Sequence, residues 1–151
     1  MAFTRLLQSR RVNLGAAMPF VLDLPAFGDR APTLLVRFAG EGNDGYMNES
    51  FKAARTLGAG QVTAQRLRTD RELDVPIYAE HVLTGWESVY EDDPEHDGKV
   101  RPAVFDLAKA QAFLLELARE VPHEFNRMRN FAQSPSNFRT SIASAEDLGK
   151  G

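Results

Sequence analysis

Two consecutive helix signals toward the C-terminal end constrain the fold most strongly. Asp106 is placed as an N-cap before a run that extends to about residue 119, in which apolar residues recur every three or four positions. The apolar stripe consists of Leu107, Ala110, Leu114, Leu117 and Val121. Pro122 then opens a second helix, which presents Phe125, Met128 and either Phe131 or Ala132. Adjoining amphipathic helices must share a core, so this part predicts a helical body.

The N-terminal part of the chain predicts a β-hairpin instead. Residues 19–24 and 33–38 are short apolar runs of the kind that form strands. Proline, glycine and aspartate between them supply the turn, and glycines at positions 40, 42 and 45 end the second strand. A hairpin followed by helices indicates the α+β class.

The middle of the chain predicts three helices. Asn48 or Ser50 caps the first, which ends at Gly58, and residues 63–73 form a second, more polar candidate. Asp74 is placed as the N-cap of a third, since a proline at position 76 suits a first helical turn. One buried stripe of this third helix comprises Tyr78, Val82 and Trp86, with Gly85 breaking the helix.

A short second hairpin is predicted next, with residues 86–90 pairing with residues 99–101 across Asp97 and Gly98. Its tip is rich in carboxylates: Glu91, Asp92, Asp93, Glu95 and Asp97. A solvated tip, an acidic surface facing a partner and a metal site are the three interpretations of this loop. The spacing fits a calcium loop poorly, since a mid-loop glycine and a later bidentate glutamate are missing.

Length and composition predict one domain. Of the 151 residues, 43% are hydrophobic and 26% charged, as in ordinary globular proteins, and no apolar run approaches the ~20 residues of a membrane span. We expect residues 1–17 to form a short amphipathic helix or arm, residues 18–138 a single α+β domain, and residues 139–151 a flexible tail. The apolar run at the start of the sequence is too short for a secretory signal. Cysteine is absent as well, so we expect a cytoplasmic protein.

No catalytic, cofactor-binding or metal site is predicted, and the chain is expected not to be an enzyme. The three histidines lack metal-binding spacing, and neither a phosphate-binding glycine motif nor a nucleophile elbow occurs. Basic residues outnumber acidic ones in residues 1–17 and 52–71. These charges either attract a protein partner electrostatically or simply form surfaces in contact with solvent. These residues are not interleaved with aromatics, so nucleic acid is not an expected partner.

Aromatic residues are the candidates for partner binding: Trp86, Phe125, Phe131 and Phe138. For the single tryptophan, core packing is the first interpretation and partner contact the second. Phe138 lies beside the SPSN segment at residues 134–137, where an exposed aromatic suits a hydrophobic partner surface.

An ordered series of short motifs spans residues 33–138. It runs from RFAG at residues 37–40, with Asn43 and Tyr46, through YAEHVL at 78–83 and GWESV at 85–89 to DGK at 97–99. It continues with the capped helix at Phe105 and Asp106, then VP at 121–122 and SPSNF at 134–138. In order and spacing the series resembles the tail assembly chaperones of siphophages. The acidic turn departs from the family pattern, since residues 94–96 lengthen it.

The resemblance implies a late protein of viral morphogenesis that acts in the host cytoplasm. Such chaperones bind the tape-measure protein, keep its hydrophobic helices soluble and recruit tail-tube subunits. Many members of the family also make a longer form by ribosomal frameshifting, and the LGKG sequence at residues 148–151 is compatible with a slippery heptamer. A structural tail-completion or connector protein of the virion is the alternative. The oligomeric state and the bound client segment do not follow from the sequence.

Overall fold

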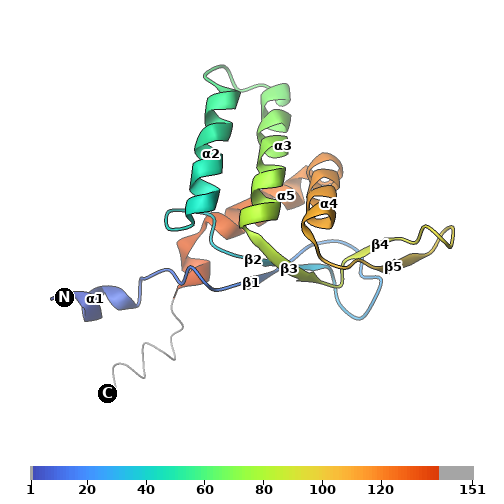
Figure 1. Ribbon diagram of the computed structural model, residues 1–151, viewed down its shortest axis with the longest axis horizontal. Coiled ribbons are helices and arrows are strands. Elements are labelled where there is room, and N and C mark those ends of the chain that lie inside the picture. Colours follow the sequence, from blue (N-terminus) through green and yellow to red (C-terminus); the bar gives the residue numbers. More distant parts are fainter. Residues whose placement is uncertain (1, 140–151) are drawn as a thin grey trace.

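The computed structural model describes residues 2–139 (Figure 1). The predicted tail and the LGKG sequence therefore lie outside the described residues, apart from Arg139. A three-stranded antiparallel sheet is formed by β1 (Met18–Val21), β2 (Thr33–Val36) and β3 (Leu83–Glu87), with β2 in the centre. The predicted N-terminal hairpin is confirmed, and its second strand, β2, buries Leu34 and Val36 completely.

Helices α2 (Asp44–Leu57) and α3 (Ala64–His81) are inserted between β2 and β3 as an antiparallel hairpin. The cap predicted at Asn48 or Ser50 is wrong, because α2 already begins after Asn43. The Asn43 Oδ1 accepts a hydrogen bond from the Tyr46 N–H, while its Nδ2 donates to the carbonyls of Phe38 and His81, each at 2.9 Å. This buried side chain thereby ties the end of β2 to both helices.

The division of residues 63–82 into two helices is also wrong, since α3 is continuous from its Thr63 cap to His81 and Pro76 lies inside it. A proline in a helix interior costs ~3 kcal/mol, because it lacks an N–H and crowds the preceding turn. Pro76 itself is exposed, whereas Val75 and Ile77 on either side of it are buried. Packing of these neighbours offsets the loss of one hydrogen bond.

The segment around Trp86 forms a strand, not the end of a helix. Gly85 pairs with Leu35 and Trp86 with Leu34 of the central strand β2, so Gly85 is not a helix breaker. Tyr78 and Val82 are buried as predicted, but the spacing that links them to Trp86 crosses the helix end at His81. After β3 the chain turns sharply at Ser88, whose φ of 60° lies in the left-handed region.

The turn at Ser88 leads into the second hairpin, β4 (Tyr90–Asp92) and β5 (Val100–Pro102), which confirms that a short hairpin follows the helices. Its first strand begins at Tyr90, four residues later than predicted, because residues 83–87 belong to the larger sheet. Of the acidic residues, Glu95 and Asp97 lie in the exposed tip, whereas Glu91 and Asp92 belong to β4, and the hairpin extends away from the body (Figure 1).

Helices α4 (Leu107–Glu120) and α5 (Pro122–Gln133) confirm the two strongest helix predictions. The carboxylate of Asp106 caps α4 by accepting from the Lys109 N–H at 2.7 Å. Leu107 was expected on the buried face but is 47% exposed, because it lies in the first turn beyond the core. A short 3-10 helix, η1 (Pro135–Phe138), follows α5.

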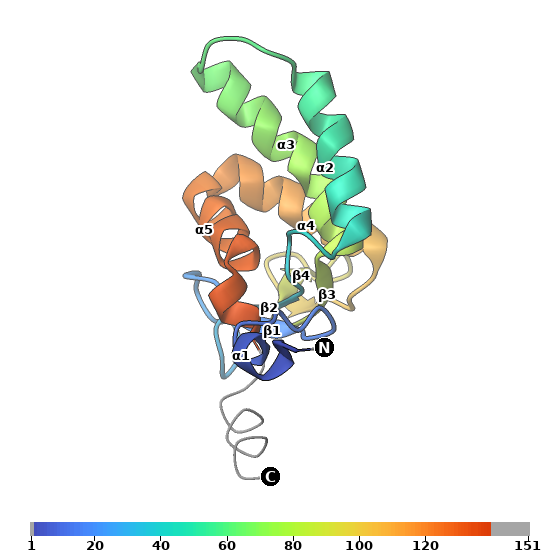
Figure 2. The ribbon, with the colours of Figure 1, turned by 90° about the vertical axis from the view of Figure 1, so that its left-hand side faces the viewer.

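All four long helices lie on the same side of the three-stranded sheet, and the core fills the space between them (Figure 2). The largest fully buried side chains are Tyr78, Phe125, Phe138, Leu22, Leu34, Leu114, Met128, Val36 and Val82. No helix in the described part of the chain combines the length and apolar character that a membrane span requires.

The N-terminal residues form the predicted short helix, α1 (Thr4–Gln8), which buries no side chain. The chain is joined to the C-terminal end of the domain at Val12, which forms a β-bridge with Arg139, and at Asn13, whose N–H donates to the Phe138 carbonyl at 2.6 Å. Residues 2–11 therefore form an arm. It lies at one end of the long axis, and the β4–β5 hairpin lies at the other (Figure 1).

Candidate partner-binding groove

Three of the four candidate aromatic residues form one cluster inside the domain. Phe125 and Phe138 are buried to 0% and 1% exposure, and Phe131 is partly buried between Phe20 and Phe138, at ring-centroid distances of 5.2 and 5.8 Å. The expectation that Phe138 is exposed is therefore wrong. The 3-10 turn folds back onto α5, where the Asn137 side chain donates to the Phe131 carbonyl, and this places the Phe138 ring in the core.

Trp86 lies apart from that cluster and is only partly buried. Its indole N–H donates to the carbonyl of Ala103 at 2.8 Å, so the polar edge of the ring is satisfied inside the protein. Phe105 and Phe113 contact it in edge-to-face geometry, at 5.0 and 5.7 Å between centroids. The indole thus has a structural role on one side, as the core interpretation predicts, while it also lines a groove.

The groove has a volume of about 610 Å³ and lies between β3, the β4–β5 hairpin and one face of α4. Its apolar lining consists of Leu24, Trp86, Val89, Ala103, Ala112, Phe113, Leu117 and Val121. Small-molecule and peptide sites share this volume range and this mostly apolar character. We refer to it as the Trp86 groove.

Sequence reasoning missed most of these lining residues. A signal for Phe113 existed, because it stands four residues before Leu117 and eight before Val121, which both belong to the predicted stripe, and so widens the apolar surface on one side of that stripe. Leu114 and Leu117 are buried in the core, whereas Phe113 is only partly buried. An apolar surface wider than one helix–helix contact requires is a sign of a second contact face.

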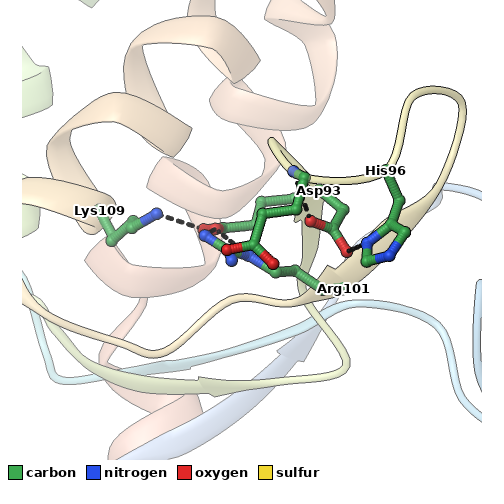
Figure 3. Close-up of polar contacts among 6 residues, drawn as sticks. Asp93, His96, Arg101 and Lys109 are labelled. Atoms are coloured by element: carbon green, nitrogen blue, oxygen red, sulfur yellow. Dashed lines mark hydrogen bonds and ion pairs between the residues drawn. The ribbon is translucent and has the colours of Figure 1, made fainter.

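Charged residues form the rim of the groove, and Glu91 holds the two cations there. Its carboxylate accepts from Arg101 at 2.9 Å and also binds the Lys109 ammonium (Figure 3). The hydrogen bond from Lys109, and then that from Arg101, lowers the pKa of Glu91 below its ordinary value. Both cations on the rim are thus neutralised in part by one strand residue.

Three other carboxylates of the rim, on Asp92, Glu116 and Glu120, are exposed. Within residues 2–139, none of them forms an ion pair. Since Glu91 already binds Arg101 and Lys109, the rim as a whole is negative. Cationic groups of a ligand therefore have available partners around an apolar floor.

The tip of the β4–β5 hairpin is held by its own hydrogen bonds. The carboxylate of Asp93 accepts from the Glu95 N–H at 2.9 Å and contacts the His96 ring at 3.1 Å (Figure 3). The Glu95 N–H bond lowers the pKa of Asp93 most. Among the described residues no group of three histidine, aspartate or glutamate side chains is arranged to hold a metal ion. The geometry fits a solvated turn stabilised by Asp93.

A second cavity, of about 630 Å³, lies between α2, α3 and α5 and is lined by both charged and apolar side chains. The guanidinium of Arg129 donates at 2.9 Å to both Asp70 and Asp74, which fixes α5 against α3. Burial raises the pKa of Asp74 more than Arg129 lowers it. These charged groups satisfy one another, so we assign them a structural role.

The Trp86 groove is therefore the site that best fits a partner. It offers an apolar floor, unpaired carboxylates and a position at the edge of the domain. Scans of protein-family models, curated proteins and solved structures returned no match to this chain. The chemistry of the groove and the motif series are the features of this chain that bear on its function.

Proposed function

We propose that this protein is a siphophage tail assembly chaperone. In this role it binds the tape-measure protein in the host cytoplasm, keeps it soluble and helps to recruit tail-tube subunits. The observation that carries the proposal is the Trp86 groove, an accessible apolar channel with a carboxylate rim. The motif series of residues 33–138, which resembles that family, supplies the identity of the client.

We infer that the client enters the groove as an amphipathic helix. Helix-in-groove recognition uses apolar side chains spaced at i, i+3 or i+4 and i+7, which enter a hydrophobic channel together. The floor contributed by Trp86 and Phe113 offers aromatic surface for such anchors. Lysine or arginine residues beside the apolar stripe of the client then pair with Glu116 and Glu120 on the rim.

Co-expression with the tape-measure protein tests the proposal. We expect this chain to raise the soluble fraction of the tape measure and to co-purify with it. Ala112→Arg should abolish both effects, because Ala112 is an exposed position of α4 that lines the groove, and a long cation there blocks an apolar anchor. Val62→Arg is the matched control, since Val62 is 77% exposed in the α2–α3 loop.

Equal solubilisation by wild type and Ala112→Arg would show that the groove does not bind the client. Failure of the wild-type chain to bind the tape measure at all would refute the chaperone assignment. Both substitutions lie at surface positions, so we expect circular dichroism to show an unchanged fold, and this is checked before binding is compared.

A structural tail-completion or connector subunit is the second candidate, and the exposed N-terminal arm favours it. Ring subunits contact their neighbours through head-to-tail interfaces, and an exposed arm offers surface for such a contact. Mass spectrometry of purified virions separates the two candidates. A chaperone should be absent from finished particles, whereas a structural subunit should be present in many copies.

A further inference from the structure

The arm formed by residues 2–11 has an apolar surface that its own domain does not cover. Phe3, Leu6 and Leu7 are 68%, 76% and 60% exposed, and α1 buries no residue. Leu6 and Leu7 lie in α1, and Phe3, its N-cap residue, precedes them by three and four positions, so the three apolar side chains lie close together on this short segment. An apolar face of this kind on a soluble domain marks a contact site.

The charge of the arm is the opposite of that of the groove rim. Arg5, Arg10 and Arg11 are its charged residues, and residues 2–17 contain no aspartate or glutamate. Within the described part of the chain none of the three arginines forms an ion pair. The arm therefore presents the same combination that the Trp86 groove selects, an apolar face beside unpaired cations.

Geometry separates the arm from the groove of its own chain. The arm is fixed to the domain at Val12 and Asn13, beside Phe138, at one end of the long axis (Figure 1). The groove is lined by residues of α4 and the β4–β5 hairpin. These elements lie toward the other end (Figure 1). Two complementary surfaces at opposite ends of one chain are the requirement for head-to-tail association.

We propose that the arm of one copy binds in the Trp86 groove of a second copy. Phe3, Leu6 and Leu7 enter the apolar floor, and the arginines of the arm pair with Asp92, Glu116 and Glu120 on the rim. The contact is heterologous, so it forms rings if the rotation closes and open chains if it does not. A client helix and the arm then compete for the same groove.

Sedimentation equilibrium of the full chain alone tests the proposal, with no tape measure present. We expect species heavier than the 16.8 kDa monomer that increase with protein concentration. The triple variant Phe3→Ser, Leu6→Ser, Leu7→Ser should weaken association at least about tenfold, and so should Ala112→Arg in the groove. Val62→Ser, at an equally exposed position far from both surfaces, should associate as wild type does.

Mixing the two defective variants is the decisive experiment. The arm variant keeps an intact groove and the groove variant keeps an intact arm, so together they should form a heterodimer and nothing larger. Raising the salt from about 0.05 to 0.5 M should weaken that heterodimer, because the ion pairs lie at the rim and are screened.

Three results would overturn the proposal: a wild-type chain that stays monomeric, association that neither variant weakens, or defective variants that fail to form a heterodimer when mixed. Since no client is present, these outcomes are independent of the tape-measure assignment. A chain that self-associates through the arm but never binds the tape measure would refute only the chaperone function.

Discussion

Glu124 provides the sharpest test of the electrostatics of the fold. It is 2% exposed, and its carboxylate binds Arg127 at 2.8 Å while it accepts from the Asp23 N–H at 2.5 Å. The hydrogen bond from Arg127 is the largest cause that lowers the pKa of Glu124 from 4.5 to about 2, and the Asp23 N–H adds to it. The substitution Glu124→Gln removes the charge and keeps an oxygen that can accept from Asp23.

The pKa shift of Glu124 sets the size of the expected loss of stability. A carboxyl group whose pKa falls from 4.5 to about 2 on folding stabilises the folded state by at most about 3 kcal/mol. The Arg127 side chain is 49% exposed, so solvent screens the pair, and we expect a loss of about 1–2 kcal/mol for Glu124→Gln at pH 7. Because the folded pKa is the lower one, this stabilisation is complete above pH 4.5 and disappears as the pH falls toward 2.

Urea unfolding of wild type and Glu124→Gln at pH 7 and pH 3 measures the loss of stability and its dependence on pH. The difference in unfolding free energy should fall to less than half between these two values of pH, while the exposed control Glu41→Gln should show almost no difference at either. A difference that does not change with pH would refute the reasoning, since it would assign the effect to packing and not to charge.

Three further substitutions test the core and the ion pairs. Trp86→Ala should destabilise the fold by about 3 kcal/mol in urea unfolding, whereas Trp86→Phe, which mainly loses the hydrogen bond to Ala103, should cost about 1 kcal/mol. Asn43→Ala should cost about 2 kcal/mol in thermal unfolding, because it leaves two carbonyls without their donor, and Asn43→Asp should not restore it. Arg129→Met should cost about 2–3 kcal/mol of unfolding free energy at pH 7, because it leaves the charge of Asp74 unpaired. The cost should be smaller at pH 4, because burial raises the pKa of Asp74 and protonation of this carboxylate removes the unpaired charge. An equal cost at pH 7 and pH 4 would contradict this account.

The parts of the fold that local chemistry determines were predictable. Asp106 and Pro122 mark the starts of α4 and α5 because a cap and a first-turn proline act within four residues of the chain. The N-terminal hairpin follows for the same reason, since its turn residues and apolar runs are adjacent in sequence. The sequence also indicates the second hairpin, although it predicts a start for the first strand four residues before the observed one at Tyr90.

The errors arise where distant contacts decide the outcome. Pro76 favours a helix start by its local chemistry, but burial of its neighbours against other elements keeps α3 continuous. Trp86 has helical spacing from Tyr78, yet pairing with β2, more than 40 residues earlier in sequence, makes it a strand residue. Nothing in the local sequence of Phe138 shows that the 3-10 turn returns it to the core.

The central position of β2 has a consequence for the order of folding. β2 joins β1 across residues 22–32 but joins β3 only across residues 37–82, a connection about four times as long. Closing the longer loop costs about 1.2 kcal/mol more in chain entropy. The β1–β2 hairpin should therefore form first, and β3 should add only after α2 and α3 have shortened the intervening chain. Synthesis on the ribosome follows the same order, because the N-terminal hairpin emerges long before the strand that completes the sheet.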